Sequence, residues 1–126
     1  MATDKILTEV KDGIGRLIFN NPKKHNAVSL EMWRSAENAL KTFEDDDSIR
    51  VVILSGAGGK SFVSGADISK FDTERGNKEA IFEYNHRVSM VNNLVVRMRK
   101  PTIAQIEGYC IGGGLGLAIC CDIRFC

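Results

Sequence analysis

The 126-residue sequence lacks the features that mark several large classes of protein. It has only two histidines, and none of its four cysteines forms a Cys-x-x-Cys pair, so we expect no metal site. It contains no apolar run long enough to span a bilayer. Its net charge is only +1, which gives no general attraction to nucleic acid or to an anionic membrane. Composition therefore predicts neither a nucleic-acid-binding protein nor a membrane protein.

The first eleven residues also lack the marks of a targeting segment. They are polar and mixed in charge, without the apolar core of a secretory signal or the Arg- and Ser-rich character of a transit peptide. This pattern predicts a cytoplasmic location, with a processed organellar protein as the alternative. Two of the cysteines, Cys120 and Cys121, stand in an apolar stretch with no histidine near them in sequence. We interpret them as small buried side chains rather than catalytic thiols.

The composition and the order of apolar patterns predict one soluble α/β domain. The chain is 44% hydrophobic and 26% charged, as in ordinary globular proteins. Residues 6–10 and 14–19 are short, partly alternating runs, and Asp12-Gly13 between them favours an antiparallel hairpin. A loop should follow over residues 20–28, and then a helix that Ser29 caps and that frays near the acidic run 45–47. Its predicted buried face is formed by Leu30, Trp33, Ala36, Leu40 and Phe43.

The second half of the sequence repeats the alternation of strand and helix. Residues 50–54 form a continuous apolar run, which is typical of a parallel strand covered on both faces. Residues 77–100 predict a helix that ends before Pro101, and a strand follows over residues 102–106. A glycine turn, an apolar helix over 115–121 and a strand over 122–125 complete the pattern. Because the sheet looks unfinished, we expect residues 1–126 to be the N-terminal portion of a larger domain.

Two glycine-containing stretches are candidates for binding an oxygen that gains negative charge. Three glycines stand before the apolar helix at residues 112–114, and Ser-Gly-Ala-Asp-Ile occupies residues 64–68. Glycine lets main-chain N–H groups approach a ligand closely, and N–H groups at a helix start lack partners within the helix. Two such donors aimed at one oxygen would form an oxyanion hole. The alternative for each stretch is simple turn chemistry.

Other glycine-based motifs do not fit. No Gly-Lys-Ser/Thr follows the glycines, so the stretch at 112–114 is not a phosphate-binding loop of that type. The spacing does not match the dinucleotide fingerprint, and the sequence has no Gly-x-Ser-x-Gly nucleophile motif.

Taken together, four stretches resemble the enoyl-CoA hydratase/isomerase (crotonase) family over essentially the whole chain. They are Asn-Pro-Lys-Lys-His-Asn-Ala at residues 21–27, residues 61–68, Ile-Glu-Gly-Tyr-Cys-Ile-Gly-Gly-Gly at 106–114, and Cys-Asp-Ile-Arg at 121–124. Each stretch is modest evidence, and the set is specific. The resemblance implies an α/β fold, a crotonase-like spiral of ββα units, assembled as a homotrimer or a dimer of trimers when complete.

The resemblance also implies an acyl-CoA thioester as substrate, in fatty-acid or related metabolism, with no separate cofactor because coenzyme A is part of the substrate. The N–H groups of Ala66 and Gly113 would form the oxyanion hole around the thioester carbonyl. Asp67 and Asn26 would fix loops, and His25 would be exposed and incidental. For the two lysines at residues 23–24 the alternative is a solvated surface charge. The CoA-binding residues implied are Lys23, Lys24, Ala27, Ser64, Ala66, Ile68, Lys70, Gly112 and Gly113.

The sequence departs from the family pattern at one catalytic position. Hydratases of the family carry a glutamate two positions beyond the third glycine, where this chain has Gly116, and their second glutamate lies farther along than residue 126. General acid–base chemistry needs a group within hydrogen-bond reach of the proton, and the 126 residues alone are therefore expected to be inactive. The remaining alternatives are an isomerase, a dehalogenase-like enzyme with another carboxylate, or an acyl-CoA-binding pseudoenzyme.

Overall fold

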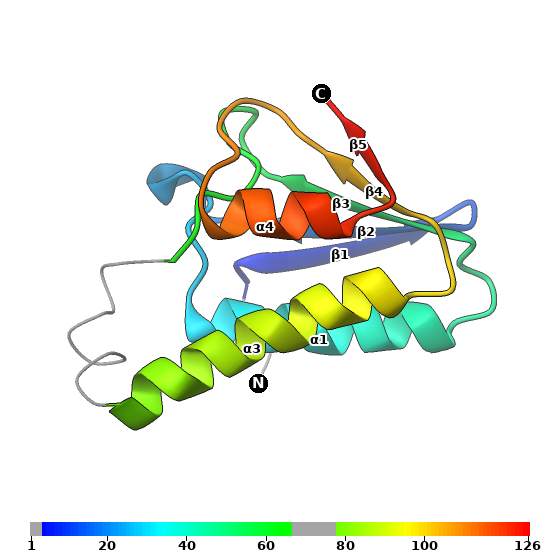
Figure 1. Ribbon diagram of the computed structural model, residues 1–126. Helices are drawn as coiled ribbons and strands as arrows, with labels where there is room; N and C mark the ends of the chain where they lie inside the picture. Colours follow the sequence, from blue (N-terminus) through cyan, green and yellow to red (C-terminus); the bar gives the residue numbers. More distant parts are fainter. Residues whose placement is uncertain (1–3, 67–77) are drawn as a thin grey trace.

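The computed structural model describes residues 4–66 and 78–126, and within them the strands form one mixed five-stranded sheet (Figure 1). The strands lie in the order β1-β2-β3-β4-β5, with β1 and β2 antiparallel and the later pairs parallel. The strands are β1 (Ile6–Lys11), β2 (Ile14–Phe19), β3 (Val51–Gly56), β4 (Thr102–Gln105) and β5 (Ile123–Phe125). The helices are η1 (Pro22–Lys24), α1 (Leu30–Asp45), α3 (Lys78–Arg97) and α4 (Gly113–Cys120).

The hairpin that opens the chain confirms the prediction made from Asp12-Gly13. Lys11 pairs with Ile14, so the turn has two residues, and both adopt positive φ, 54° at Asp12 and 80° at Gly13. This left-handed pair is the turn geometry whose twist matches that of two antiparallel strands. The crossover from β2 through α1 to the parallel strand β3 confirms the predicted βαβ unit.

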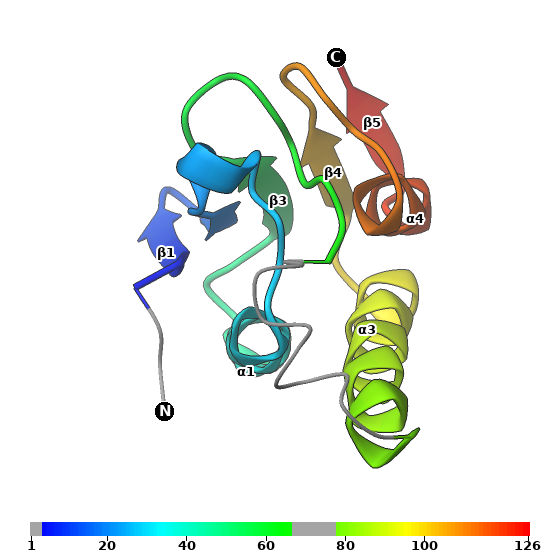
Figure 2. The same ribbon diagram turned by 90° about the vertical axis from the view of Figure 1, so that its left-hand side faces the viewer.

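The hydrophobic core lies between the sheet and the helices α1, α3 and α4, which cover one side of the sheet (Figure 2). Ser29 caps α1 as predicted, because its hydroxyl oxygen accepts a hydrogen bond from the Met32 N–H at 3.2 Å. On β3 the side chains of Val52 and Leu54 are fully buried, whereas Val51 and Ile53 are only half-buried. The prediction of a strand covered on both faces is therefore confirmed only in part for the described residues, because the face with Val51 and Ile53 is partly covered.

Lys100, from another part of the chain, lies at the C-terminal end of α1, where the acidic run 45–47 begins. The Lys100 ammonium donates to the main-chain carbonyls of Phe43 and Asp46 at the C-terminal end of the helix. A cation at this end interacts favourably with the helix dipole and satisfies carbonyls that lack partners within the helix. The helix therefore ends at Asp45, within the predicted boundary, and the Asp46 carboxylate accepts from the Ser48 N–H at 2.9 Å.

The cysteine predictions are confirmed in part. Cys121 is 4% exposed, and burial raises the pKa of its thiol to about 11, so it is not a thiolate at neutral pH. Cys120 is only half-buried, which corrects the expectation that both thiols are enclosed. None of the helices in the described residues has the length and apolar character that crossing a membrane requires.

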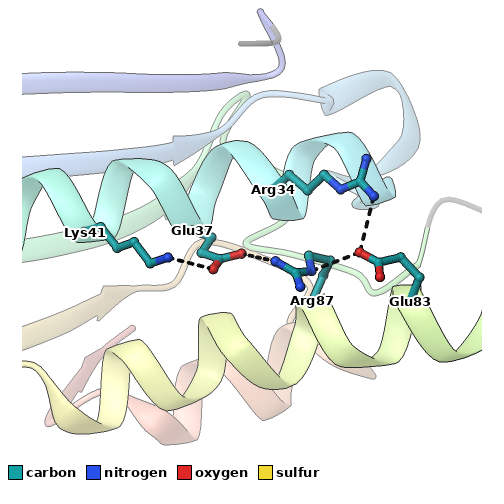
Figure 3. A network of polar contacts seen from close by, with 5 residues as sticks. All are labelled: Arg34, Glu37, Lys41, Glu83 and Arg87. Carbon is teal, nitrogen blue, oxygen red and sulfur yellow. Dashed lines mark hydrogen bonds and ion pairs between the residues drawn. The ribbon is translucent and has the colours of Figure 1, made fainter.

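A chain of ion pairs joins α1 to α3 around Glu37 (Figure 3). The Glu37 carboxylate meets the Arg87 guanidinium at 2.7 Å and the Lys41 ammonium at 3.1 Å, and its side chain is only 7% exposed. Arg87 also lies 3.1 Å from Glu83, which pairs with Arg34 at 3.2 Å. Burial of Glu37 raises the pKa of its carboxyl, but Lys41 and Arg87 lower it more, and the pKa lies below its usual value.

The depressed pKa of Glu37 predicts a loss of stability in acid. The pair contributes stability above the pKa of glutamate in the unfolded chain, about 4.3, and this contribution disappears as pH falls through the lower folded-state pKa. Replacing Glu37 by Gln should lower the free energy of unfolding by about 1–3 kcal/mol at pH 7 and flatten its decline in acid. Urea unfolding at a series of pH values measures both effects.

The control for Glu37 is Glu44→Gln, which removes the exposed pair with Arg99. Exposed pairs contribute little, so this variant should change the unfolding free energy by less than about 1 kcal/mol. Equal effects of the two substitutions would contradict the assignment of the acid dependence to Glu37.

Candidate functional site

The two glycine-containing stretches, far apart in sequence, lie against one another. Residues 63–65 contact residues 112–114 so closely that a Cβ added to Gly114 would lie 1.7 Å from the carbonyl oxygen of Val63. A Cβ added to Gly65 would lie 3.5 Å from the main-chain nitrogen of Gly113, and one added to Gly112 would lie 3.6 Å from the oxygen of Ser64. Glycine is needed at Gly114 because the two main chains meet there without room for a Cβ, and it is favoured at Gly65 and Gly112 because their φ angles are positive, 110° and 54°.

The start of α4 differs in one respect from the prediction. The glycines do not precede the helix, because Gly113 and Gly114 form its first turn and Gly112 is the cap, with φ 54° and ψ −126°. The N–H of Gly114 donates to Ile111 at 2.9 Å, and that of Gly116 donates to Gly112 at 3.1 Å. The N–H of Gly113 has no acceptor among the described residues, and the same holds for the N–H of Ala66. Within the described parts of the chain, two main-chain donors without an acceptor thus lie on the two adjoining glycine stretches.

The loop before α1 is tied to the loop after β3 by the buried side chain of Asn26. Its amide oxygen accepts from the Asn21 N–H at 2.8 Å, and its amide nitrogen donates to Ala57 and Ser61 carbonyls at 3.0 and 2.8 Å. Asn26 has φ 58°, a left-handed conformation that asparagine tolerates better than most residues. The interpretation of Asn26 as a loop-fixing residue is confirmed.

Sequence reasoning did not single out Ser61, which joins three loops at this site. Its buried hydroxyl lies 2.8 Å from the His25 carbonyl and 3.2 Å from the Tyr109 carbonyl. Two main-chain hydrogen bonds reinforce this contact, from Phe62 to Tyr109 at 2.8 Å and from Tyr109 to Lys60 at 3.1 Å. A serine among loop residues gives no signal in the sequence, because its partners lie 36 and 48 positions away.

A hollow of about 330 Å³ opens beside the glycine loops and is lined by His25, Ser64, Tyr109 and Ile111. The rings of His25 and Tyr109 meet edge to face, with their centroids 5.5 Å apart and their planes at 90°. His25 is exposed, as predicted, and its ring lies on this hollow. The hollow has an apolar wall and a few polar groups, which is typical of a small-molecule site.

The other predicted binding residues are placed as follows. Lys23 and Lys24 are exposed on η1 and line a second hollow of about 330 Å³, together with Lys5 and Asp4. Ala27 is buried, with its N–H donating to Lys24 at 3.0 Å and its carbonyl accepting from Asn21 at 2.9 Å. The predictions for Asp67, Ile68 and Lys70 lie outside the described residues.

Position 116 offers space but no acid. A Cβ added to Gly116 would have nothing within 4 Å, so the helix could carry a side chain there. The exposed Glu107 does not replace the missing carboxylate, because its carboxylate oxygen lies 3.8 Å from the Cβ position of Gly59, on the loop after β3. In the described parts of the chain no group of three or more His, Cys, Asp or Glu side chains could hold a metal ion.

The model of the enoyl-CoA hydratase/isomerase family matches residues 9–126. The chain belongs to this family. It is 36% identical over 124 residues to a crotonyl-CoA hydratase of Syntrophomonas wolfei, covering 98% of this chain and 47% of that protein. It is also 37% identical over 119 residues to the human mitochondrial 3-hydroxyisobutyryl-CoA hydrolase, covering 94% of this chain and 31% of the hydrolase.

A solved structure described as an enoyl-CoA hydratase/carnithine racemase from Magnetospirillum magneticum matches with a TM-score of 0.90 and 44% identity, over 98% of this chain and 46% of that one. The predicted crotonase-type α/β fold is thus confirmed. This member of the enoyl-CoA hydratase/isomerase family spans about half the length of the hydratase and of the solved structure that it matches.

Proposed function

We propose that the protein to which this sequence belongs acts on acyl-CoA thioesters and stabilises the thioester enolate between the main-chain N–H groups of Ala66 and Gly113. The observation that carries the proposal is the contact between residues 63–65 and 112–114, next to which the N–H groups of Ala66 and Gly113 have no acceptor among the described residues. Its relatives support the substrate class, because their names are those of enzymes that act on CoA esters.

The chemistry follows from where charge develops. When a base removes a proton from the carbon next to the thioester carbonyl, the electrons of that C–H bond form the enolate double bond, and negative charge develops on the carbonyl oxygen. Two fixed N–H donors stabilise that oxygen more than they stabilise the neutral carbonyl, and one such donor typically contributes about 3–4 kcal/mol to the transition state. The Gly113 donor also stands at the positive end of α4.

The hollow beside the loops is the proposed entry for the acyl-CoA chain. His25 and Tyr109 would contact it through their rings, and Ser64 lies on the same wall. Lys23 and Lys24 would meet the phosphate groups of coenzyme A as point charges from η1. Coenzyme A enters as part of the substrate, and the assembly as trimers stays a prediction from the family resemblance.

A second candidate function rests on Gly116. A glycine at this position neither takes nor gives a proton, although the space around it would admit a side chain. This observation favours isomerase or dehalogenase-like chemistry that uses another carboxylate, or binding of acyl-CoA without turnover, over hydration by two glutamates.

Calorimetric titration of the intact protein to which this sequence belongs, with acetoacetyl-CoA and with free coenzyme A, tests the proposal. Acetoacetyl-CoA is readily converted to its enolate, so we expect it to bind more tightly than coenzyme A. The absorbance of the enolate should increase when acetoacetyl-CoA binds. No heat with either ligand would contradict acyl-CoA binding, and equal affinities would contradict the oxyanion hole. Turnover of an enoyl-CoA by the intact protein would contradict the binding-only alternative.

A further inference from the structure

A series of hydrogen bonds runs from the helix pair α1 and α3 to the loop that carries Ala66. The indole N–H of Trp33 donates to the hydroxyl oxygen of Tyr84 at 3.0 Å, and the Tyr84 hydroxyl donates to the carbonyl of Val28 at 2.8 Å. The N–H of Val28 in turn donates to the carbonyl of Gly65 at 2.7 Å. Each link joins segments that are distant in the sequence.

The last link reaches the site through the main chain. Val28 and Ala66 form an isolated parallel β-bridge, so the extended segment before α1 sets the direction of the backbone at Ala66. Gly65 lies between this bridge and Gly113, since a Cβ added to Gly113 would be 3.4 Å from the Cα of Gly65. A shift of Val28 would therefore move one proposed oxyanion donor relative to the other.

The hydrogen bonds of this series lie largely away from water, which increases the cost of losing one of them. Trp33 is 1% exposed and Val28 is fully buried, while Tyr84 is half-buried on α3. Hydrogen bonds made away from water are electrostatically stronger than those in water, and a buried donor that loses its acceptor carries a desolvation cost. The Tyr84 hydroxyl joins both neighbours, because it accepts from one and donates to the other.

We propose that Tyr84 is a positioning residue that fixes the Val28–Ala66 bridge and thereby the direction of the Ala66 N–H. It does not touch the reacting atoms in this proposal and acts through Val28. The consequence at the site rests on the proposed function, whereas the coupling of Tyr84 to the bridge does not.

The test compares Tyr84→Phe, which removes the hydroxyl and keeps the ring, with Glu83→Gln. The control stands next to Tyr84 on α3 and loses ion pairs with Arg34 and Arg87, none of which reaches Val28. Amide hydrogen exchange of the full 126-residue chain is followed by NMR, and the exchange rate of the Val28 amide is compared with the rates of the β2 and β3 amides. In Tyr84→Phe this ratio should rise about fivefold, the factor expected for the loss of one neutral hydrogen bond. The control should leave this ratio unchanged.

Exchange that rises equally at Val28 and in the strands would mean that the hydroxyl serves only global stability, and it would overturn the proposal. Unchanged exchange at Val28 would overturn it as well. Calorimetric titration adds a second readout: Tyr84→Phe should lower the affinity for acetoacetyl-CoA and leave that for free coenzyme A unchanged. An unchanged affinity ratio beside faster exchange at Val28 would overturn the positioning role. A wild-type chain that binds neither ligand would contradict the proposed function, and the exchange data would still decide the coupling.

Discussion

Replacing Gly114 by alanine is expected to destabilise the chain by at least about 3 kcal/mol, because the new methyl group has no space. Its carbon would lie 1.7 Å from the Val63 carbonyl oxygen and 2.5 Å from the carbonyl carbon, both main-chain atoms that cannot turn aside. The two glycine loops would have to separate. Such a loss is a large part of the stability of an ordinary domain, and it corresponds to a fall in melting temperature of about 10 °C or more.

The matched control stands two residues farther along the same helix. Gly116→Ala adds the same methyl group where nothing lies within 4 Å, and alanine favours the helix over glycine. We expect it to stabilise the chain by about 0.5–1 kcal/mol. Thermal melts of the three proteins, followed by circular dichroism, measure both effects. A similar loss in both variants would show that helix formation, and not the contact with Val63, sets the requirement for glycine.

Replacing Gly113 by proline is expected to abolish the preference of the site for the enolate. Proline has no N–H, and loss of one oxyanion donor typically costs about 100-fold or more. Its ring suits the first position of a helix. The preceding Gly112 has φ 54° and ψ −126°, which is not the helical conformation that a following proline disfavours. We therefore expect the affinity for acetoacetyl-CoA to fall about 100-fold while the affinity for coenzyme A is retained.

Gly113→Ala is the control, since it keeps the N–H and its Cβ would make an ordinary contact 3.4 Å from the Cα of Gly65. Calorimetric titration of both variants with acetoacetyl-CoA and with coenzyme A separates the donor from the shape of the loop. If Gly113→Ala lost as much enolate affinity as Gly113→Pro, packing would explain the effect. If Gly113→Pro lost none, the assignment of this donor would be wrong.

Elements whose pattern is local were predictable from the sequence. The Asp12-Gly13 turn and the Ser29 cap follow from the chemistry of neighbouring residues and are confirmed. The predicted buried face of α1 is confirmed except at Leu30, which is only half-buried, and the buried Met32 and Glu37 were not predicted. The partial cover of the β3 face that carries Val51 and Ile53 was not predictable, because covering a strand depends on elements elsewhere in the chain. The same reason explains why Gly113 and Gly114 belong to the first turn of α4, since the contact that leaves no room for a Cβ at Gly114 comes from the distant Val63 carbonyl.

For the site, sequence reasoning found the two loops but not what holds them together. The glycines and Asn26 carry conformational requirements that show in a motif. Ser61 and Tyr84 act through hydrogen bonds to partners 36 to 56 positions away, and a serine or tyrosine at such positions looks like any other. Physical neighbourhood, not residue type, gives these two side chains their roles.

The order of the strands has a consequence for how the chain is made. Because β1 to β5 lie side by side in the order in which they occur in the sequence, each new strand joins the edge formed by the previous one. None of these five described strands must be inserted between two that are already paired. Because synthesis on the ribosome proceeds from the N-terminus, the sheet can grow by adding each new strand at the same edge as the chain emerges. Each helix can then pack on the sheet before the next strand is made.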